Sequence, residues 1–231
     1  MKLLSVGTNA KTVKGDRTSE YLTAIMYLSP HKNNKKQVNL CPKASAGCAA
    51  ACLYTAGRGK FSNVQEARTK KSEWFISDRE GFLQQLHKEL LDFSRYARLR
   101  GKRPAVRLNG TSDILWERYL KMQLYPEIQF YDYSKWKPED RKPLGNYDIT
   151  YSRAEDTSDS EVKRVLKKDV NMTVVFRSDV TLPTSFLGYK VINGDTTDLR
   201  FLDVKGVVVG LQAKGDAKKD TSGFVIQQVK L

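Results

Sequence analysis

The sequence predicts an α/β fold, a partial or complete TIM-like βα barrel, and three observations favour this class. Short β-rich runs alternate with helical segments along the 231 residues. No repeat, low-complexity tract or Gly/Ser linker divides the chain, and one domain commonly has this length. Several apolar runs end in small, polar or charged residues, as barrel strands do on the face where ligands bind. We therefore expect a single domain over residues 1–231.

The predicted strands are runs rich in β-branched and aromatic residues between polar loops. The first run, residues 21–29, reads YLTAIMYLS, and the polar loop PHKNNKKQ and the cysteine segment follow it. The other candidate strands cover residues 105–113, 127–134, 147–156, 172–178, 189–195, 204–215 and 224–231.

Helices are predicted between these strands. Residues 63–100 form one or two helices, because large apolar side chains recur there at three-to-four spacing with charges between them. A break or cap is expected at Ser77 and Asp78. Shorter helices are expected at residues 114–122 and 158–168, so that strands and helices alternate along the chain.

The chain is strongly basic, with 40 Lys and Arg against 26 Asp and Glu and a formal net charge of +14. This balance favours a nucleic-acid partner or a nucleotide-like substrate, but a solvated basic surface without a partner fits it equally well. The N-terminal apolar run is too short for a signal peptide. No stretch approaches the about 18 apolar residues of a membrane span. We expect a soluble cytoplasmic protein with no membrane partner.

All three cysteines lie in the segment NLCPKASAGCAAACLYTAGRGK, as Cys41, Cys48 and Cys52. An odd number cannot all pair within one chain, and cytosolic thiols are kept reduced, so a disulfide framework does not explain them. In a short helix Cys48 and Cys52 would share one face, and a loop containing Gly47 would bring Cys41 to the same point. The surrounding Ala, Ser and Gly residues leave room for a bulky inorganic group.

Three interpretations of the cysteines remain open. Three thiolates with one open coordination position suit a [4Fe–4S] cluster whose unique iron binds a small ligand. A closed zinc site needs a fourth protein ligand, which His31 is placed to supply, whereas His87 belongs to the amphipathic helical segment. Alternatively, the thiols pack as small apolar groups with no metal. Arg58, the nearest arginine, either binds an anion or caps helix carbonyls.

The cysteine loop after the first strand, followed by a βα succession, resembles the radical S-adenosylmethionine enzymes, although their usual spacing is Cys-x3-Cys-x2-Cys and this chain has Cys-x6-Cys-x3-Cys. The resemblance implies that the open iron binds S-adenosylmethionine and that an electron donor serves the cluster. It implies further that the ligand's amino group is held by the loop Asn109, Gly110, Thr111, Ser112 and Asp113. Its carboxylate and ribose would meet Ser152, Arg153, Arg177 and Asn193.

A longer pattern, C-P-x-A-S-x-G-C-x-x-x-C-L-x-T-A-G-R-G, resembles the phage gene product eighty-eight family. That resemblance implies a phage origin and a cysteine-based site, and leaves the reaction open. The sequence thus gives two hypotheses of different class. The first is a [4Fe–4S] protein of radical S-adenosylmethionine type, and the second is a basic nucleic-acid-binding protein with a structural zinc ligated by the cysteines and His31.

Overall fold

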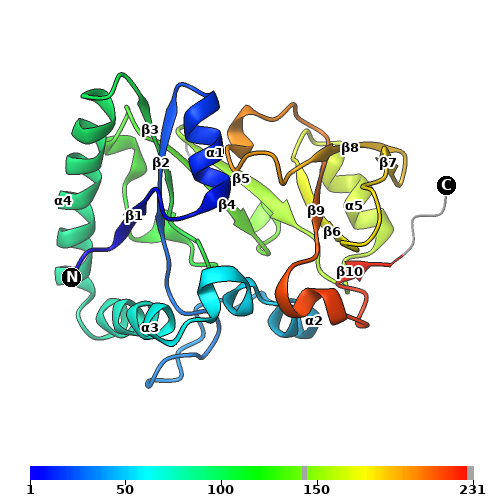
Figure 1. Cartoon of the computed structure of the whole chain (residues 1–231), viewed down its shortest axis with the longest axis horizontal. Coiled ribbons are helices and arrows are strands. Elements are labelled where there is room, and N and C mark those ends of the chain that lie inside the picture. Colours follow the sequence, from blue (N-terminus) through cyan, green and yellow to red (C-terminus); the bar gives the residue numbers. More distant parts are fainter. Residues whose placement is uncertain (142–144, 228–231) are drawn as a thin grey trace.

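The strands of this chain form one open sheet in the computed structural model, which describes residues 1–141 and 145–227 (Figure 1). The order along the sheet is β1-β2-β3-β4-β5-β6-β9-β8-β7, and β10 pairs with β6 off this path. The strands are β1 (Leu4–Val6), β2 (Tyr21–Met26), β3 (Arg103–Arg107), β4 (Gln129–Ser134), β5 (Tyr147–Ser152), β6 (Met172–Phe176), β7 (Ser185–Phe186), β8 (Tyr189–Asn193), β9 (Val208–Gln212) and β10 (Val225–Ile226).

The prediction of a TIM-like barrel is wrong, because the sheet does not close. Its two edges are formed by β1, antiparallel to β2, and by β7, antiparallel to β8. Between them, β2 to β6, β9 and β8 are parallel. A βα barrel needs an outer ring of helices. Among the described residues only short 3₁₀ turns lie between β3 and β4 and between β4 and β5, so that ring is missing.

The α-helices of the described chain are α1 (Ala10–Thr18), α2 (Ala46–Ala50), α3 (Ser62–Ser77), α4 (Arg79–Arg98) and α5 (Asp159–Leu166). The predicted break at Asp78 is confirmed, since the Asp78 side chain accepts a hydrogen bond from the Gly81 N–H and caps α4. Ser158 caps α5 in the same way through the Glu161 N–H. None of these helices is both long and apolar enough to cross a bilayer.

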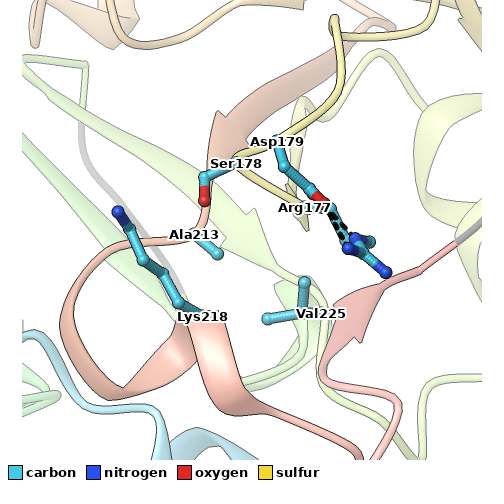
Figure 2. Close-up of a pocket in the computed structure, with 6 residues that line it drawn as sticks. All are labelled: Arg177, Ser178, Asp179, Ala213, Lys218 and Val225. Carbon is cyan, nitrogen blue, oxygen red and sulfur yellow. Dashed lines mark hydrogen bonds and ion pairs between the residues drawn. The ribbon is translucent and has the colours of Figure 1, made fainter.

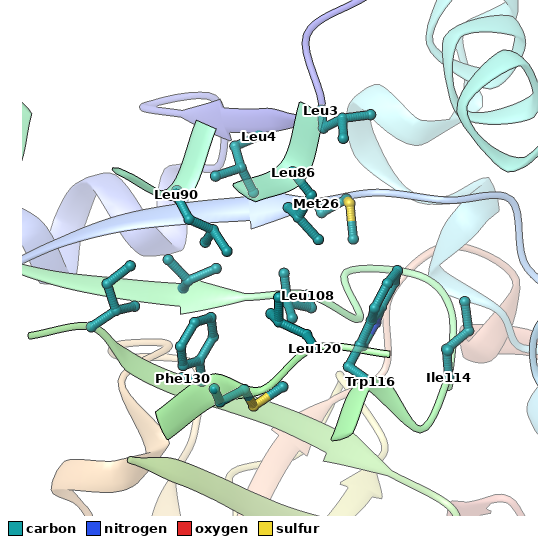
Figure 3. Close-up of a cluster of buried hydrophobic side chains, with 14 of the residues drawn as sticks. Leu3, Leu4, Met26, Leu86, Leu90, Leu108, Ile114, Trp116, Leu120 and Phe130 are labelled. Atoms are coloured by element: carbon teal, nitrogen blue, oxygen red, sulfur yellow. The ribbon is translucent and has the colours of Figure 1, made fainter. Parts of the chain in front are cut away.

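Alternate residues of β2 face two different layers. Ala24 and Met26 belong to the large apolar cluster under α4 (Figure 3). Thr23, which points the other way, donates to Asp16 of α1 at 2.7 Å. In the large cluster Trp116 is fully buried against Phe75, and burying a side chain of this kind contributes about 1.5–3 kcal/mol.

Three local predictions need correction. The helix predicted at residues 114–122 is wrong, because this segment forms the 3₁₀ turn η3 (Trp116–Arg118) and the start of η4 (Met122–Leu124). The Asn109 side chain accepts a hydrogen bond from the Ile114 N–H and holds a turn there. The helix α1 was not predicted. Of the last predicted strand, 224–231, only Val225–Ile226 is a strand, and residues 228–231 lie outside the described part of the chain.

Candidate functional site

The cysteine loop is attached to the carboxyl ends of the parallel strands. The Leu40 carbonyl accepts from the Asp113 N–H at 2.8 Å, and the Cys41 Sγ donates to the Thr111 carbonyl at 3.6 Å. Both contacts reach the loop that follows β3. In an open parallel sheet this edge is where ligands bind.

The second half of the loop is fixed by Glu155, which follows β5. The Gly47 N–H donates to Glu155 Oε1 at 2.7 Å, and Ser45 Oγ donates to Glu155 Oε2 at 2.5 Å. Ser45 also caps the short helix α2 by accepting from the Cys48 N–H. A Cβ on residue 47 would lie 2.8 Å from Glu155 Oε2, so only glycine allows this close approach.

The predicted i, i+4 relation between Cys48 and Cys52 is wrong. α2 ends at Ala50, and Cys52 has extended backbone angles (φ −59°, ψ 132°) just before η1 (Leu53–Thr55). Cys48 instead packs against the apolar cluster of Ala51, Ala213 and Val225. The third thiol, Cys41, is buried beside the loop after β3.

The three thiols are nevertheless close enough to act on one another. Burial raises the pKa of Cys41 to about 12, with further increases from Asp113 and from the other two cysteines. Burial also raises the pKa of Cys48 and of Cys52, while Lys135 opposes the shift at Cys48. Three thiolates would repel each other here, and a bound metal ion is the group that relieves such repulsion.

Lys135, which follows β4, brings three strand ends together. Its Nζ donates to Ser152 Oγ and to the Arg153 carbonyl, both at 2.8 Å. Its backbone N–H donates to Asp113 Oδ2, and Ser134 Oγ donates to Asp113 Oδ1. Burial lowers the pKa of Lys135, and Cys48, Asp113 and Glu155 counteract that shift.

Asp113 therefore lies near the cysteine loop, and Lys135 links it to Ser152, whereas the sequence did not single out Lys135 or Glu155. Lys135 directly follows β4, and Glu155 lies three residues beyond the end of β5. Both residues therefore come just after the polar strand endings on which the site prediction was based. The pattern YDYSK contained a lysine whose reach covers two neighbouring strand ends. Its role depends on long-range placement, which the sequence does not give.

The polar side chains of the loop from Asn109 to Ser112 form hydrogen bonds within the protein. Asn109 Oδ1 accepts from Ser112 Oγ and from the Ile114 N–H. Gly110 approaches β2 so closely that a Cβ would lie 2.6 Å from the Met26 carbonyl, and Thr111 Oγ1 donates to the Leu28 carbonyl. These residues shape the edge of the site by positioning Asp113, and their side chains are already engaged.

The remaining predicted residues are spread over a wider area. Arg153 Nη1 donates to the Gly223 carbonyl at 2.9 Å. Arg58 is exposed on η2 (Gly57–Lys60). Asn193 is exposed at the end of β8, and its Oδ1 accepts from the Asp195 N–H.

Arg177 belongs to a separate small cavity of about 210 Å³ at the ends of β6 and β9 (Figure 2). Its guanidinium pairs with Asp179, and Lys218 lines the same cavity. Ala213 and Val225 line this cavity and also belong to the apolar cluster against which Cys48 packs. The cavity and the cysteine loop are thus neighbours separated by apolar side chains.

The donor set fits a soft metal centre, although the ligands are not gathered around one point. In residues 1–141 and 145–227 no group of three or more His, Cys, Asp or Glu side chains is arranged to hold an ion. Cys48 and Cys52 both raise the pKa of Cys41, and three neighbouring thiols are the ligand chemistry of iron–sulfur clusters and zinc.

The backbone of His31 lies next to the cysteine loop. The His31 carbonyl accepts from the Leu40 N–H at 3.0 Å, and the backbone of His31 partly offsets the rise in the pKa of Cys41. Burial lowers the pKa of His31, which favours the neutral imidazole that binds metals. The other histidine, His87, lies on α4 and hydrogen-bonds to the Tyr125 hydroxyl.

Comparison with protein families gives a match over nearly the whole chain. The model of the family described as Gene product 88 covers residues 2–228, which include the cysteine loop and all ten strands. No curated protein and no solved structure matches the chain. The match confirms the family resemblance and lends no support to the resemblance to radical S-adenosylmethionine enzymes. The chain belongs to the phage-type gene product 88 family.

Proposed function

We propose that this protein carries a [4Fe–4S] cluster ligated by Cys41, Cys48 and Cys52, with an open iron position for S-adenosylmethionine or a similar small molecule. One observation carries the proposal: three mutually interacting thiols are fastened to the edge of the sheet where parallel strands end. Such a cluster supplies one-electron chemistry and a coordination position for a ligand.

The protein's own part is to hold the thiols and to govern their charge. Glu155 and Asp113 fix the two halves of the loop, so that the cysteines stay close together. The ammonium group of Lys135 favours the thiolate form of Cys48. Burial excludes water, and the raised thiol pKa values mean that protons must leave as the metal binds.

Titration of S-adenosylmethionine into the anaerobically reconstituted protein tests the ligand part of the proposal. The electron paramagnetic resonance spectrum of the reduced cluster is expected to change saturably, because a ligand at the open iron alters its coordination. A cluster spectrum that S-adenosylmethionine leaves unchanged contradicts that part. If no cluster forms after reconstitution, the whole proposal fails.

A second candidate function is favoured by the position of His31. With His31 as fourth ligand the cysteines would form a closed structural zinc site, and the net charge of +14 would then serve nucleic-acid binding in the host cytoplasm. This candidate predicts a colourless zinc protein whose affinity for DNA or RNA falls steeply as the salt concentration rises. Salt-independent or undetectable binding contradicts it.

A further inference from the structure

Arg68 is a buried cation that has no acidic partner among the described residues. It lies on α3, only 9% of its surface is exposed, and two of its guanidinium nitrogens, Nε and Nη1, are buried without a hydrogen-bond partner in the described structure. A buried charge without a partner is unfavourable, and native structures seldom keep one without a use.

Two other arginines, with side chains at most 15% exposed, show what a structural role looks like. Arg141 forms a two-bonded pair with Glu117 at 2.9 and 2.7 Å. Arg107 lies 3.2 Å from Asp198. Arg68, in contrast, interacts electrostatically with Tyr27, Tyr54 and the thiol of Cys52, and with no carboxylate.

Two aromatic rings hold the Arg68 guanidinium in place. The ring of Tyr27 lies 4.9 Å and the ring of Tyr54 lies 5.5 Å from the guanidinium carbon. Tyr27 follows β2 directly, and its hydroxyl accepts from Asn9 at 3.2 Å. Stacking of this kind orients a guanidinium while leaving its N–H groups for another acceptor.

The segment that precedes α3 packs close to Arg68. The backbone of Gly59 passes so close that a Cβ there would lie 3.3 Å from Arg68 Nη1. Tyr54 and Cys52 belong to the segment that connects the cysteine loop to α3. Arg68 therefore faces the same edge of the sheet as the cysteines, at the end of β2.

We propose that Arg68 binds an oxyanion, a carboxylate or phosphate group of a small ligand, beside Cys52. The position beside a metal centre rests on the proposed function, whereas the oxyanion site itself needs no metal. Carboxylate and phosphate oxygens are the acceptors that a planar guanidinium pairs with two at a time. The ligand class is thus a small anion whose charged group pairs with the Arg68 guanidinium.

Nuclear magnetic resonance of the arginine Nε–H groups in the full chain tests this site directly. The Arg68 signal is identified by its loss in R68K, and inorganic phosphate, acetate and S-adenosylmethionine are then titrated in turn. We expect a saturable shift of the Arg68 signal with at least one of these probes, and their relative affinities distinguish a phosphate from a carboxylate ligand. A signal that none of the three shifts overturns the proposal.

Variants give a second measurement by equilibrium dialysis of the same probes. R68M, which removes the charge, is expected to abolish binding, and R68K, which keeps the charge but loses the paired N–H groups, to weaken it at least tenfold. K70Q is the matched control, because Lys70 is an exposed cation on the same helix. Equal binding by R68M and K70Q overturns the proposal.

The outcome separates this site from the cluster. Metal-free protein that binds an oxyanion through Arg68 supports the inference even if no iron is found. Iron-loaded protein in which the Arg68 signal ignores every probe refutes the inference and leaves the cluster proposal intact. The titration itself uses the wild-type protein, and the R68K variant is needed only to identify the Arg68 signal.

Discussion

Glu155 holds the cysteine loop through the backbone of Gly47. The Gly47 N–H donates to Glu155 Oε1 at 2.7 Å across 108 positions of sequence. The second carboxylate oxygen accepts from Ser45, which caps the helix carrying Cys48. A single acidic side chain after β5 therefore sets where the middle cysteine lies relative to the strand ends.

Replacing this carboxylate should loosen the loop. E155Q keeps one acceptor oxygen but loses the charge, so we expect unfolding free energy to fall by about 1 to 2 kcal/mol and the metal to be lost more readily to a chelator. E161Q is the control, since Glu161 pairs with Arg164 on α5 instead of the loop. Equal metal retention in the two variants would show that Glu155 does not organise the site.

Asp198 is predicted to be essential for folding. It is buried between Arg107 at 3.2 Å and Lys11 at 3.3 Å, and it accepts from the Tyr131 hydroxyl. D198N would remove the carboxylate that Lys11 and Arg107 share and leave Arg107 only its 3.9 Å contact with Asp132, so we expect a loss of about 3 to 5 kcal/mol in a denaturant titration. The exposed D92N serves as the control. A loss below about 1 kcal/mol would contradict the structural role.

Asp132 should make stability depend on pH. Burial raises its pKa to about 7, while the unfolded chain has an ordinary aspartate value near 4. Between these two values the folded state binds the extra proton, so unfolding free energy falls as pH rises from about 4 to 7. D132N should remove this component and flatten the profile by roughly 2 kcal/mol or more, measured by denaturation at several pH values. An unchanged slope would contradict the prediction.

Much of the local structure follows from the sequence, and the closure of the sheet does not. Asp78 and Ser158 cap helices where the pattern predicts helix starts. The barrel prediction failed because the short edge strands β1 and β7 pair antiparallel, and short pairings carry little sequence signal.

The sequence also gave little signal for the residues of the site that are brought together from distant segments. The three cysteines stand out by clustering, and Asp113 by following a strand. Arg68 resembles any surface arginine of a charged helix, although it lies four and seven positions before the buried Ser72 and Phe75. That spacing marks the inward face of α3 and was the available signal.

Replacing His31 separates the two candidate centres. H31A should abolish a closed zinc site of three cysteines and one histidine, and should leave a three-cysteine cluster largely unchanged. H87A, on the outer helix α4, is the control. Metal content per chain is the measurement, and loss of iron in H31A alone would contradict the open-site account.

The central claim is that three cysteines hold one iron–sulfur cluster. Anaerobic purification followed by iron, sulfide and zinc analysis, with an absorption spectrum of the same sample, tests it most directly. The account predicts about four irons and four sulfides per chain in a brown protein that reductant bleaches. About one zinc per chain in a colourless sample, or a protein that takes up no metal on reconstitution, would contradict it.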